Sequence, residues 1–332
     1  MKKIYILFVL IVFLLAVKIS DAEPNKPGFP KKLSDITDLS DIGCDLCGCY
    51  MGLDPNFSMN QVGIRFHTYK FFSEGHPSTG SSATSNDPQL DHADHGENSS
   101  TEYYNDLELY LRYYISPKFR LLFSIPFSSN DINGKTLNGT GDARLLTQYQ
   151  IYNTDITGKT NFWHRIFLGG GVKFPTGVYN KTLTYGVVDP HFQPGTGSFD
   201  FLFNGLYMAK LEKDGLGWRN DIVYTVNTEN SNGYRFANRF NITSTFTYDI
   251  ITSTLTFLPH AGIYFESSAE DKQDGKDTPD TGGNAFFGTG GVDVYYDVFS
   301  LDFNYQFKIS DNLNGDQPGN EFRLYLGLGY AF

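Results

Sequence analysis

The three cysteines of this 332-residue chain lie together in Cys44-Asp-Leu-Cys47-Gly-Cys49, a CxxCxC cluster. Thiolates at this spacing can reach one soft or borderline cation, so the cluster predicts a Cu(I) or Zn(II) site. In an oxidising compartment, two of the cysteines could instead form a disulfide, leaving the third free or paired elsewhere. Lipid attachment at Cys44 is disfavoured by a cleavage site predicted upstream at Ala22. The sequence leaves a metal site and a disulfide as two open alternatives for this cluster.

Histidines form a second group of candidate ligands. His76 is followed by Asp91-His92-Ala-Asp94-His95, within a stretch rich in Ser, Gly and Asn. Imidazoles three residues apart with carboxylates between them can bind Zn or Cu weakly. The alternative is a solvated loop that uses polar residues for solubility.

Two acidic segments, 270–277 and 311–316, have a spacing similar to that of calcium-binding loops. Neither completes the twelve-position pattern with a terminal Glu. We therefore expect solvated loops, with weak Ca²⁺ contact as the alternative.

The N-terminus predicts export. Lys2 and Lys3 precede an apolar run at 4–17, and Ser20-Asp-Ala22 follows as a small-x-small cleavage site. A membrane-anchor helix is the alternative, but the run is short for a bilayer span. We expect a cleaved signal peptide at 1–22. No later stretch approaches the roughly 18 apolar residues that a spanning helix requires.

Period-two alternation of apolar and polar residues runs through most of the remaining chain. Between Leu301 and Ile309, every odd position is apolar, and Asp, Asn, Gln and Lys stand between them. Such a strand suits lipid on one face and water on the other, although a soluble sandwich shows the same alternation with the faces inverted. The 22 Tyr and 29 Phe favour strands and membrane interfaces.

The connections between strands favour the membrane. Short connections alternate with mostly long ones, as the short periplasmic turns and long external loops of a barrel do. The strands are expected near 59–72, 102–116, 118–128, 141–153, 162–175, 199–212, 217–229, 234–249, 253–266, 284–297, 299–310 and 320–332. The fold class is all-β: a transmembrane antiparallel β-barrel of twelve strands at 59–332. A short Cys-containing segment at 23–58 would lie in the periplasm or plug the barrel.

The last strand alternates to a terminal phenylalanine. From Phe322 to Phe332, every second residue is apolar and large. This resembles the C-terminal signal strand that the barrel-insertion machinery of Gram-negative bacteria reads. Tyr330 and Phe332 are therefore the expected insertion signal, and localisation in the outer membrane follows from it.

Three glycine-rich motifs resemble a known family. They are Gly139-Thr-Gly-Asp-Ala143, Gly169-Gly-Gly-Val-Lys-Phe-Pro-Thr-Gly177 and Gln193-Pro-Gly-Thr-Gly-Ser-Phe-Asp200. Together they are similar to the outer-membrane channel family named for the meta-pathway of phenol degradation. The resemblance implies a barrel with a transport role, without implying phenol as the solute. More loosely, the chain is similar to Bacteroidetes barrels with a Cys-rich segment before the first strand. We expect the Pro and Gly residues of the motifs to shape turns.

The alternation also predicts which charged residues face the lumen. These charges could pair into a rigid polar core, or they could line a narrow water path. The expected lumen residues are Arg65, His67, Glu108, Arg112, Arg120, Arg144, Lys173, Asp200, Lys210, Arg219, Asp221, Arg239, Asp293, Asp302, Lys308 and Arg323.

A channel or transporter for a small solute is the function that these features favour, with transition-metal handling as a further hypothesis. A non-conducting scaffold acting with a partner is the alternative. A hydrolase is less favoured. The segment Glu229-Asn-Ser231-Asn-Gly233 resembles the Ser/Asn region of outer-membrane phospholipase, but Glu229 stands where that enzyme has a histidine, so the serine has no evident activating base. The expected partners are membrane lipid, the insertion machinery and the solute. A net charge of −11 argues against nucleic acid.

Overall fold

The structure, a computed structural model, describes residues 60–73, 99–154, 162–182, 188–211 and 215–332. This part of the chain consists of β-strands and loops with one short 3₁₀ helix, η3 (Pro190–Phe192). Within it, no helix has the length and apolar character needed to cross a membrane. The predicted signal peptide at 1–22 and the segment 23–58 lie outside the described residues.

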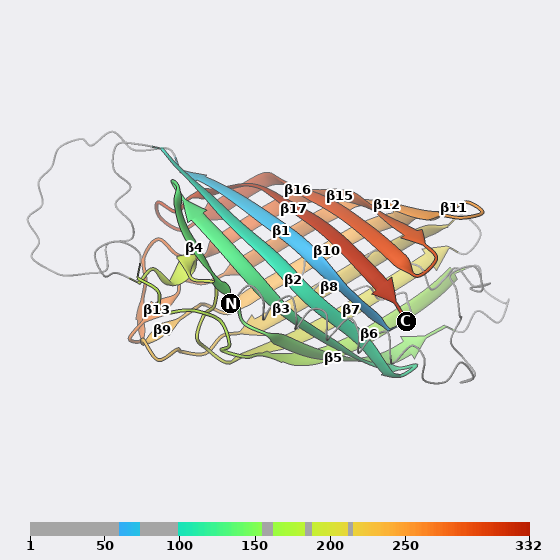
Figure 1. Cartoon of the computed structure of the whole chain (residues 1–332), viewed down its shortest axis with the longest axis horizontal. Helices are drawn as coiled ribbons and strands as arrows, with labels where there is room; N and C mark the ends of the chain where they lie inside the picture. The colour runs from blue at the N-terminus through green and yellow to red at the C-terminus, as the bar shows by residue number, and fades with distance from the viewer. Residues whose placement is uncertain (1–59, 74–98, 155–161, 183–187, 212–214) are drawn as a thin grey trace, which may run out of the picture.

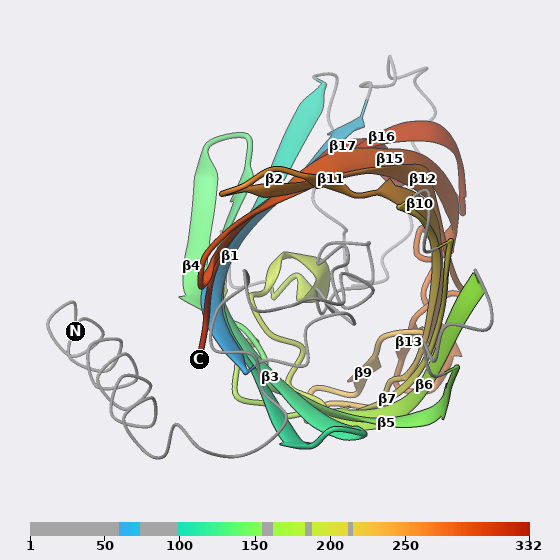
Figure 2. The same ribbon diagram turned by 90° about the vertical axis from the view of Figure 1, so that its right-hand side faces the viewer.

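Twelve antiparallel strands form a closed ring (Figure 2). Each wall strand pairs with the wall strands before and after it in the chain; β10, for example, pairs with both β8 and β12. This confirms the predicted twelve-stranded barrel. The wall strands are β1 (Gln61–Ser73), β2 (Ser100–Ser116), β3 (Phe119–Ile132), β5 (Arg144–Asn153), β6 (Phe162–Lys173), β7 (Asp200–Leu211), β8 (Leu216–Val226), β10 (Arg239–Tyr248), β12 (Thr256–Ser268), β15 (Gly283–Tyr296), β16 (Phe299–Leu313) and β17 (Gly319–Ala331).

The ring is closed by its first and last strands, which lie side by side in Figure 1. Their antiparallel register runs from Gln61 opposite Ala331 to Phe72 opposite Gly319. Closure leaves no unpaired strand edge in the wall, which is the condition for a sheet to stand in lipid.

The outer face of the wall is apolar, and the inner face buries most of the charged and polar side chains together with apolar clusters such as Leu146, Leu202 and Val223. In β16, Leu301 and Phe303 are 54% and 39% exposed, whereas Asp302 and Asn304 between them are 0% exposed. In a globular core the apolar residues would be the buried ones. An exposed apolar exterior around a buried polar interior is the arrangement of a transmembrane barrel.

The two ends of the barrel differ. At one end, which we call the short-turn end, connections such as 117–118 and 297–298 are brief, and the C-terminus lies there (Figure 1). At the other, the long-loop end, the connections carry extra structure. In membrane barrels the longer loops face outward from the cell.

One predicted loop, 129–140, is instead a hairpin. Strand β3 continues to Ile132, and β4 (Lys135–Thr140) returns along it. The turn is Asn133-Gly134, and both residues have positive φ, 50° and 82°. Positive φ at both central positions defines the tight hairpin turn for which Asn-Gly is the preferred sequence.

The predicted strand 234–249 is shorter in the structure. Its first residues form β9 (Tyr234–Arg235), which pairs with β13 (Lys272–Gln273) and not with the wall; β13 in turn pairs with β14 (Lys276–Asp277). Before β10 begins, Asn227 Nδ2 donates to the Ala237 carbonyl at 2.6 Å. Side-chain bonds of this kind compete with the strand ladder. A short strand, β11 (Ile250–Ile251), continues the line of β10 and pairs with the start of β12 at the short-turn end.

Candidate functional site

Most of the predicted lumen residues are buried on the inner face of the wall. Arg144, Lys173 and Arg239 are partly buried. Lys308 is exposed, and its Nζ lies 3.6 Å from Asp311 Oδ2 near the long-loop end. Those less than a tenth exposed are Arg65, His67, Glu108, Arg112, Arg120, Asp200, Lys210, Arg219, Asp221, Asp293, Asp302 and Arg323.

On β1, β2 and β5, several of these charges gather around Glu108. Its Oε2 lies 3.4 Å from Arg65 NH1 and 3.9 Å from His67 Nε2, and its Oε1 lies 3.9 Å from Arg144 NH1. A buried carboxylate with cationic neighbours is stabilised against the loss of its hydration. This part of the lumen wall is therefore held in one arrangement by charge pairing.

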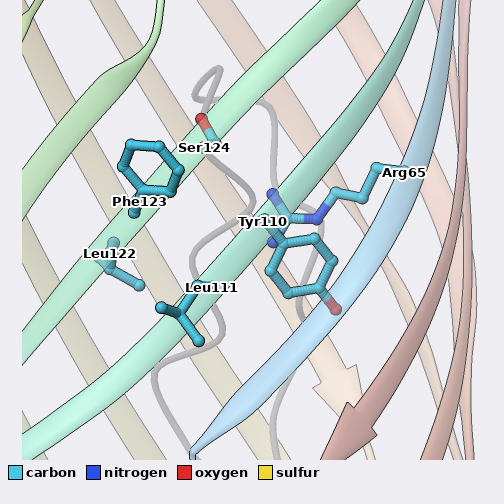
Figure 3. A pocket seen from close by; sticks show the side chains of 6 residues that line it. All are labelled: Arg65, Tyr110, Leu111, Leu122, Phe123 and Ser124. Atoms are coloured by element: carbon cyan, nitrogen blue, oxygen red, sulfur yellow. The ribbon is translucent and has the colours of Figure 1, made fainter. Parts of the chain in front are cut away.

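Arg65 also covers an aromatic ring. Its guanidinium carbon lies over the Tyr110 ring, 3.7 Å from the ring centre, and Figure 3 shows the two side chains next to each other. Such cation–π contacts favour Arg, whose planar head stacks on the ring. The cavity between this pair and Leu122 and Ser124 measures about 10 Å³, about the smallest space that holds one water.

Across β3, β5, β7 and β8, polar side chains form a continuous chain of hydrogen bonds. Arg120 Nε donates to Gln148 Oε1 at 2.7 Å, and Gln148 donates in turn to Asn204. Asn204 Nδ2 donates to Asp221 Oδ1 at 2.8 Å, and Arg219 NH2 lies 3.2 Å from the other oxygen of Asp221. The network links four strands and fixes the orientation of each inward side chain.

A third group surrounds Arg323 of β17. Its guanidinium bonds Glu266 of β12 at 2.5 and 3.0 Å, so the two side chains span the width of β15 and β16. The Phe287 ring lies 4.2 Å from the guanidinium carbon, and Tyr69 and Tyr264 lie 5.5 Å away. The lumen wall is thus mixed in charge, with cations and anions next to each other.

The three glycine-rich motifs meet at one place near the long-loop end, centred on Asp142. Its Oδ1 accepts from Gly177 N at 2.9 Å, and its Oδ2 accepts from Thr196. Lys173 lies 3.6 Å from Asp142 Oδ2 and also contacts Asp200. Segments more than 50 residues apart in sequence are therefore joined through one buried carboxylate.

At this junction two glycines are in contact. A Cβ atom on Gly177 would lie 2.8 Å from Gly195 Cα, and one on Gly195 would lie 2.7 Å from Gly177 Cα. Only residues without a side chain permit backbones to approach this closely. The backbone of Val178 bridges the neighbours, donating to the Thr140 carbonyl and accepting from Gly195 N.

Residues 188–199, which we call the inward loop, lie inside the ring. Figure 2 shows η3 as a coiled yellow-green ribbon within the barrel outline. Phe192 is fully buried, and its ring lies 6.2 Å from that of Tyr104 on β2. Asn130 Nδ2 on β3 donates to the Phe192 carbonyl at 2.9 Å. The inward loop therefore rests against the inner wall and narrows the lumen.

On its other side, the inward loop contacts the remaining long loops through His191. His191 Nε2 lies 2.9 Å from Asp271 Oδ2 and 3.0 Å from Tyr234 OH. Tyr234 OH donates to the same Asp271 oxygen at 2.7 Å, and Ala237 N donates to the other at 2.7 Å. Three separate loops thus converge on one carboxylate.

The electrostatics of this group follow from its contacts. Loss of hydration alone would lower the pKa of His191, but the hydrogen bond and charge of Asp271, together with Asp189, raise it above the usual value near 6.5. Desolvation would raise the pKa of Asp271, and the bonds from His191, Ala237 and Tyr234 lower it instead. Both shifts favour the ionised pair.

Sequence reasoning did not single out His191, Asp142 or Glu266. Asp142 could have been noticed as the one charged residue of the first glycine-rich motif. His191 carries no local signal, because its partner is 80 residues away in the chain. Asp271 was considered only as part of an acidic loop.

The predicted metal ligands fall largely outside the described residues. Cys44, Cys47, Cys49, His76, His92, Asp94 and His95 all lie there. Within the described ranges, no three His, Cys, Asp or Glu side chains converge as metal ligands. In the acidic segments, Asp271 holds the loops together, and Asp311 Oδ2 accepts from Asn320 N.

The structure also describes Ser231, the candidate nucleophile of the less favoured hydrolase function. Ser231 Oγ lies 3.0 Å from Tyr179 OH, in the loops of the long-loop end. A tyrosine hydroxyl at neutral pH is not a base that activates a serine.

No protein-family model and no curated protein sequence matches this chain. Solved structures do. The COG4313 outer membrane channel from Pseudomonas putida F1 is 14% identical, with a TM-score of 0.55 over 82% of this chain and 96% of that one. The β domain of the Bordetella autotransporter Brka (12% identity, TM-score 0.43, 83% and 100% coverage) and the NanC porin (11%, 0.41, 83% and 100%) are also similar. The chain has the fold of an outer-membrane β-barrel.

Proposed function

We propose that this protein is an outer-membrane channel for a small solute, which passes through the lumen of the barrel. The supporting observation is the inner face of the wall, where many buried charged and polar side chains lie beside apolar clusters such as Leu146 and Leu202, while the outer face is apolar. The core of a globular protein would bury few charged side chains. A polar interior enclosed by a wall in lipid is the arrangement that porins use for a water path.

Unpaired polar atoms within the lumen support a hydrated interior. Among the described side chains, both amide atoms of Gln306 and the hydroxyl of Ser124 are buried without a hydrogen-bond partner in the protein. Leaving such a group unsatisfied costs about 1–3 kcal/mol. Water is the partner that normally removes this cost.

The charge pattern of the lumen points to the kind of solute. Rings of one sign select ions of the other. Here the charges form pairs such as Arg65 with Glu108 and Arg323 with Glu266. A wall of paired charges exerts little net field, which suits a small polar solute without a large net charge.

Planar-bilayer conductance of the refolded full chain tests the channel. We expect discrete steps, with weak preference between cations and anions. Folding is checked separately by heat-modifiable migration in SDS gels. Folded protein that gives no steps, either intact or with residues 23–58 deleted, would instead indicate a scaffold. The scaffold remains the second candidate because the inward loop occupies part of the lumen.

Transition-metal handling is a finer proposal, carried by the Cys44, Cys47 and Cys49 cluster. Serine substitution of all three should abolish tight binding of Cu(I) or Zn(II) to the purified protein. Unchanged metal stoichiometry in the triple variant would remove this part of the proposal.

We further propose export through the signal peptide 1–22 and insertion through Tyr330 and Phe332 into the outer membrane of a Gram-negative cell. The mass of the mature protein should correspond to cleavage after Ala22. Removal of Phe332 should reduce assembly in cells while leaving export unchanged.

A further inference from the structure

The inward loop is held between two different kinds of contact. Against the wall, Phe192 is buried and bonded through its backbone carbonyl to Asn130, and no ionisable side chain takes part in that bond. Against the other loops, the adjacent residue His191 bonds Asp271 and Tyr234. One residue therefore anchors the loop to the wall, and its neighbour supplies the titratable tie to the loops of the long-loop end. Thr196, further along the inward loop, adds bonds from Asn230 Nδ2 and to Asp142.

The Asp271 side of this contact is preorganised. Besides the bond from Ala237 N, the backbone N–H of Asp271 donates to Thr281 Oγ1 at 2.8 Å, and its carbonyl accepts from Thr278 N at 2.8 Å. Its carboxylate therefore has a fixed place whether or not a histidine is present. His191, in contrast, has a side chain that is 41% exposed, so solvent protons can reach it.

The charged and titratable groups around His191 come from every adjoining segment. Asp189 lies on the inward loop itself, Tyr234 on β9 and Asp271 in the loop between β12 and β15; Arg239 begins β10. Of these, the two carboxylates favour a protonated imidazole and Arg239 opposes it. The carboxylates prevail, because Asp271 is in direct contact.

We infer that the His191–Asp271 contact is a proton-operated latch that keeps the inward loop across the lumen, and that loss of the proton loosens it. The inference rests on the proposed channel function and adds a mode of regulation. A hydrogen bond between two charged groups is roughly twice as strong as one in which the imidazole is neutral. Deprotonation therefore weakens the tie between the inward loop and the other loops, while the wall contact of Phe192 is unaffected.

The direction of the pH effect follows from the pKa of His191. Because closure raises that pKa, the closed state binds the proton more tightly than the open state. The stabilisation of the closed state is complete below the usual histidine pKa and is lost as pH rises through the raised value. The closed-to-open ratio should change about tenfold for each unit by which closure raises the pKa.

Single-channel recordings of the refolded full chain, from about pH 5 to about pH 8, test the latch. The wild type should open more often as pH rises. His191→Gln should be open and insensitive to pH, and His191→Lys, which keeps a positive charge, should stay closed throughout. His164→Gln, on the outer face of β6, is the matched control and should keep the wild-type pH response.

Hydrogen exchange of the inward loop gives a second readout that does not depend on conduction. After correction for intrinsic rates, amide protection at 188–196 should fall with rising pH in the wild type and be low at every pH in His191→Gln. If protection changes in this way but no current is seen, the latch holds and the channel function fails. Protection and opening that depend on pH equally in wild type and His191→Gln would overturn the latch.

Discussion

The carboxylate of Asp142 accepts two hydrogen bonds from Thr196, one from the backbone N–H and one from the hydroxyl, each at 2.8 Å. With the third bond, from Gly177 N, this carboxylate joins the end of β4 to both ends of the β6–β7 connection. The position of the inward loop therefore depends on a residue outside that loop.

Substituting Asp142 tests this dependence. Asp142→Ala should lower the free energy of unfolding by about 2–4 kcal/mol, because three donors and the Lys173 ammonium lose a buried acceptor. Urea titration of the protein folded in lipid vesicles measures this change.

The control for Asp142→Ala is Asp131→Asn near the end of β3, beside the exposed β3–β4 turn, where Asp131 accepts from Gly134 N and Thr136 Oγ1. We expect it to cost about 1 kcal/mol or less. An equal loss of unfolding free energy in the two variants would mean that the buried Asp142 carboxylate stabilises the fold no more than the Asp131 carboxylate does.

Gly177→Ala should displace the inward loop. Its Cβ would lie 2.7 Å from the backbone of Gly141 and 2.8 Å from Gly195. Overpacking of this kind costs about 1–3 kcal/mol. Raised hydrogen exchange at 188–199, with the wall strands unchanged, is the expected result.

Gly170→Ala is the matched control for Gly177→Ala, since the nearest atom to its Cβ would be 3.8 Å away. It should change stability by about 0.5 kcal/mol or less. If both alanines are tolerated alike, the close approach of the glycines does not position the loop.

The outward face of β16 faces lipid, so a charged side chain placed there should lower the free energy of unfolding. Phe303 is paired across the sheet with Val292 and Leu326, in the apolar band. Phe303→Arg should lower the free energy of unfolding in vesicles by about 2–4 kcal/mol. Glu229→Arg, in an exposed loop, should have an effect of about 0.5 kcal/mol or less. A cysteine at Phe303 that reacts readily with aqueous reagents would contradict the assignment.

Closure of the long loops should be strongest within a limited pH window. Asp271 has a lowered pKa, so its contribution is present above its usual value and lost on strong acidification; His191 has a raised pKa, so its contribution is lost toward alkaline pH. Asp271→Asn should therefore remove both limits and lower amide protection at 269–282 at neutral pH. Asp297→Asn, in the turn before β16, should leave the window unchanged.

The barrel wall could be predicted from the sequence because its signal is local. Phe303 faces out and Asn304 faces in because adjacent residues of a strand point to opposite faces, and that alternation can be seen in nine residues. Each strand pairs with the strand before it and the strand after it, so the order of strands around the wall follows their order in the sequence. The Asn133-Gly134 hairpin had an equally local signal in its turn residues.

The candidate site could not be predicted in the same way. His191 meets Asp271 only because two loops fold toward each other above the lumen, and nothing in the neighbourhood of either residue records that. Similarly, the motifs around Gly177 and Gly195 were expected to shape turns, but their contact with each other depends on the path of the whole connection.

The pairing of β1 with β17 sets an order of events in biogenesis. Strand β1 lacks a partner on one side until β17 is made, because Gln61 pairs with Ala331. A nascent chain or a C-terminal truncation would therefore carry two open strand edges, which attract other chains and are intolerable in hydrocarbon. In this wall, both edges disappear only when β1 and β17 pair with each other.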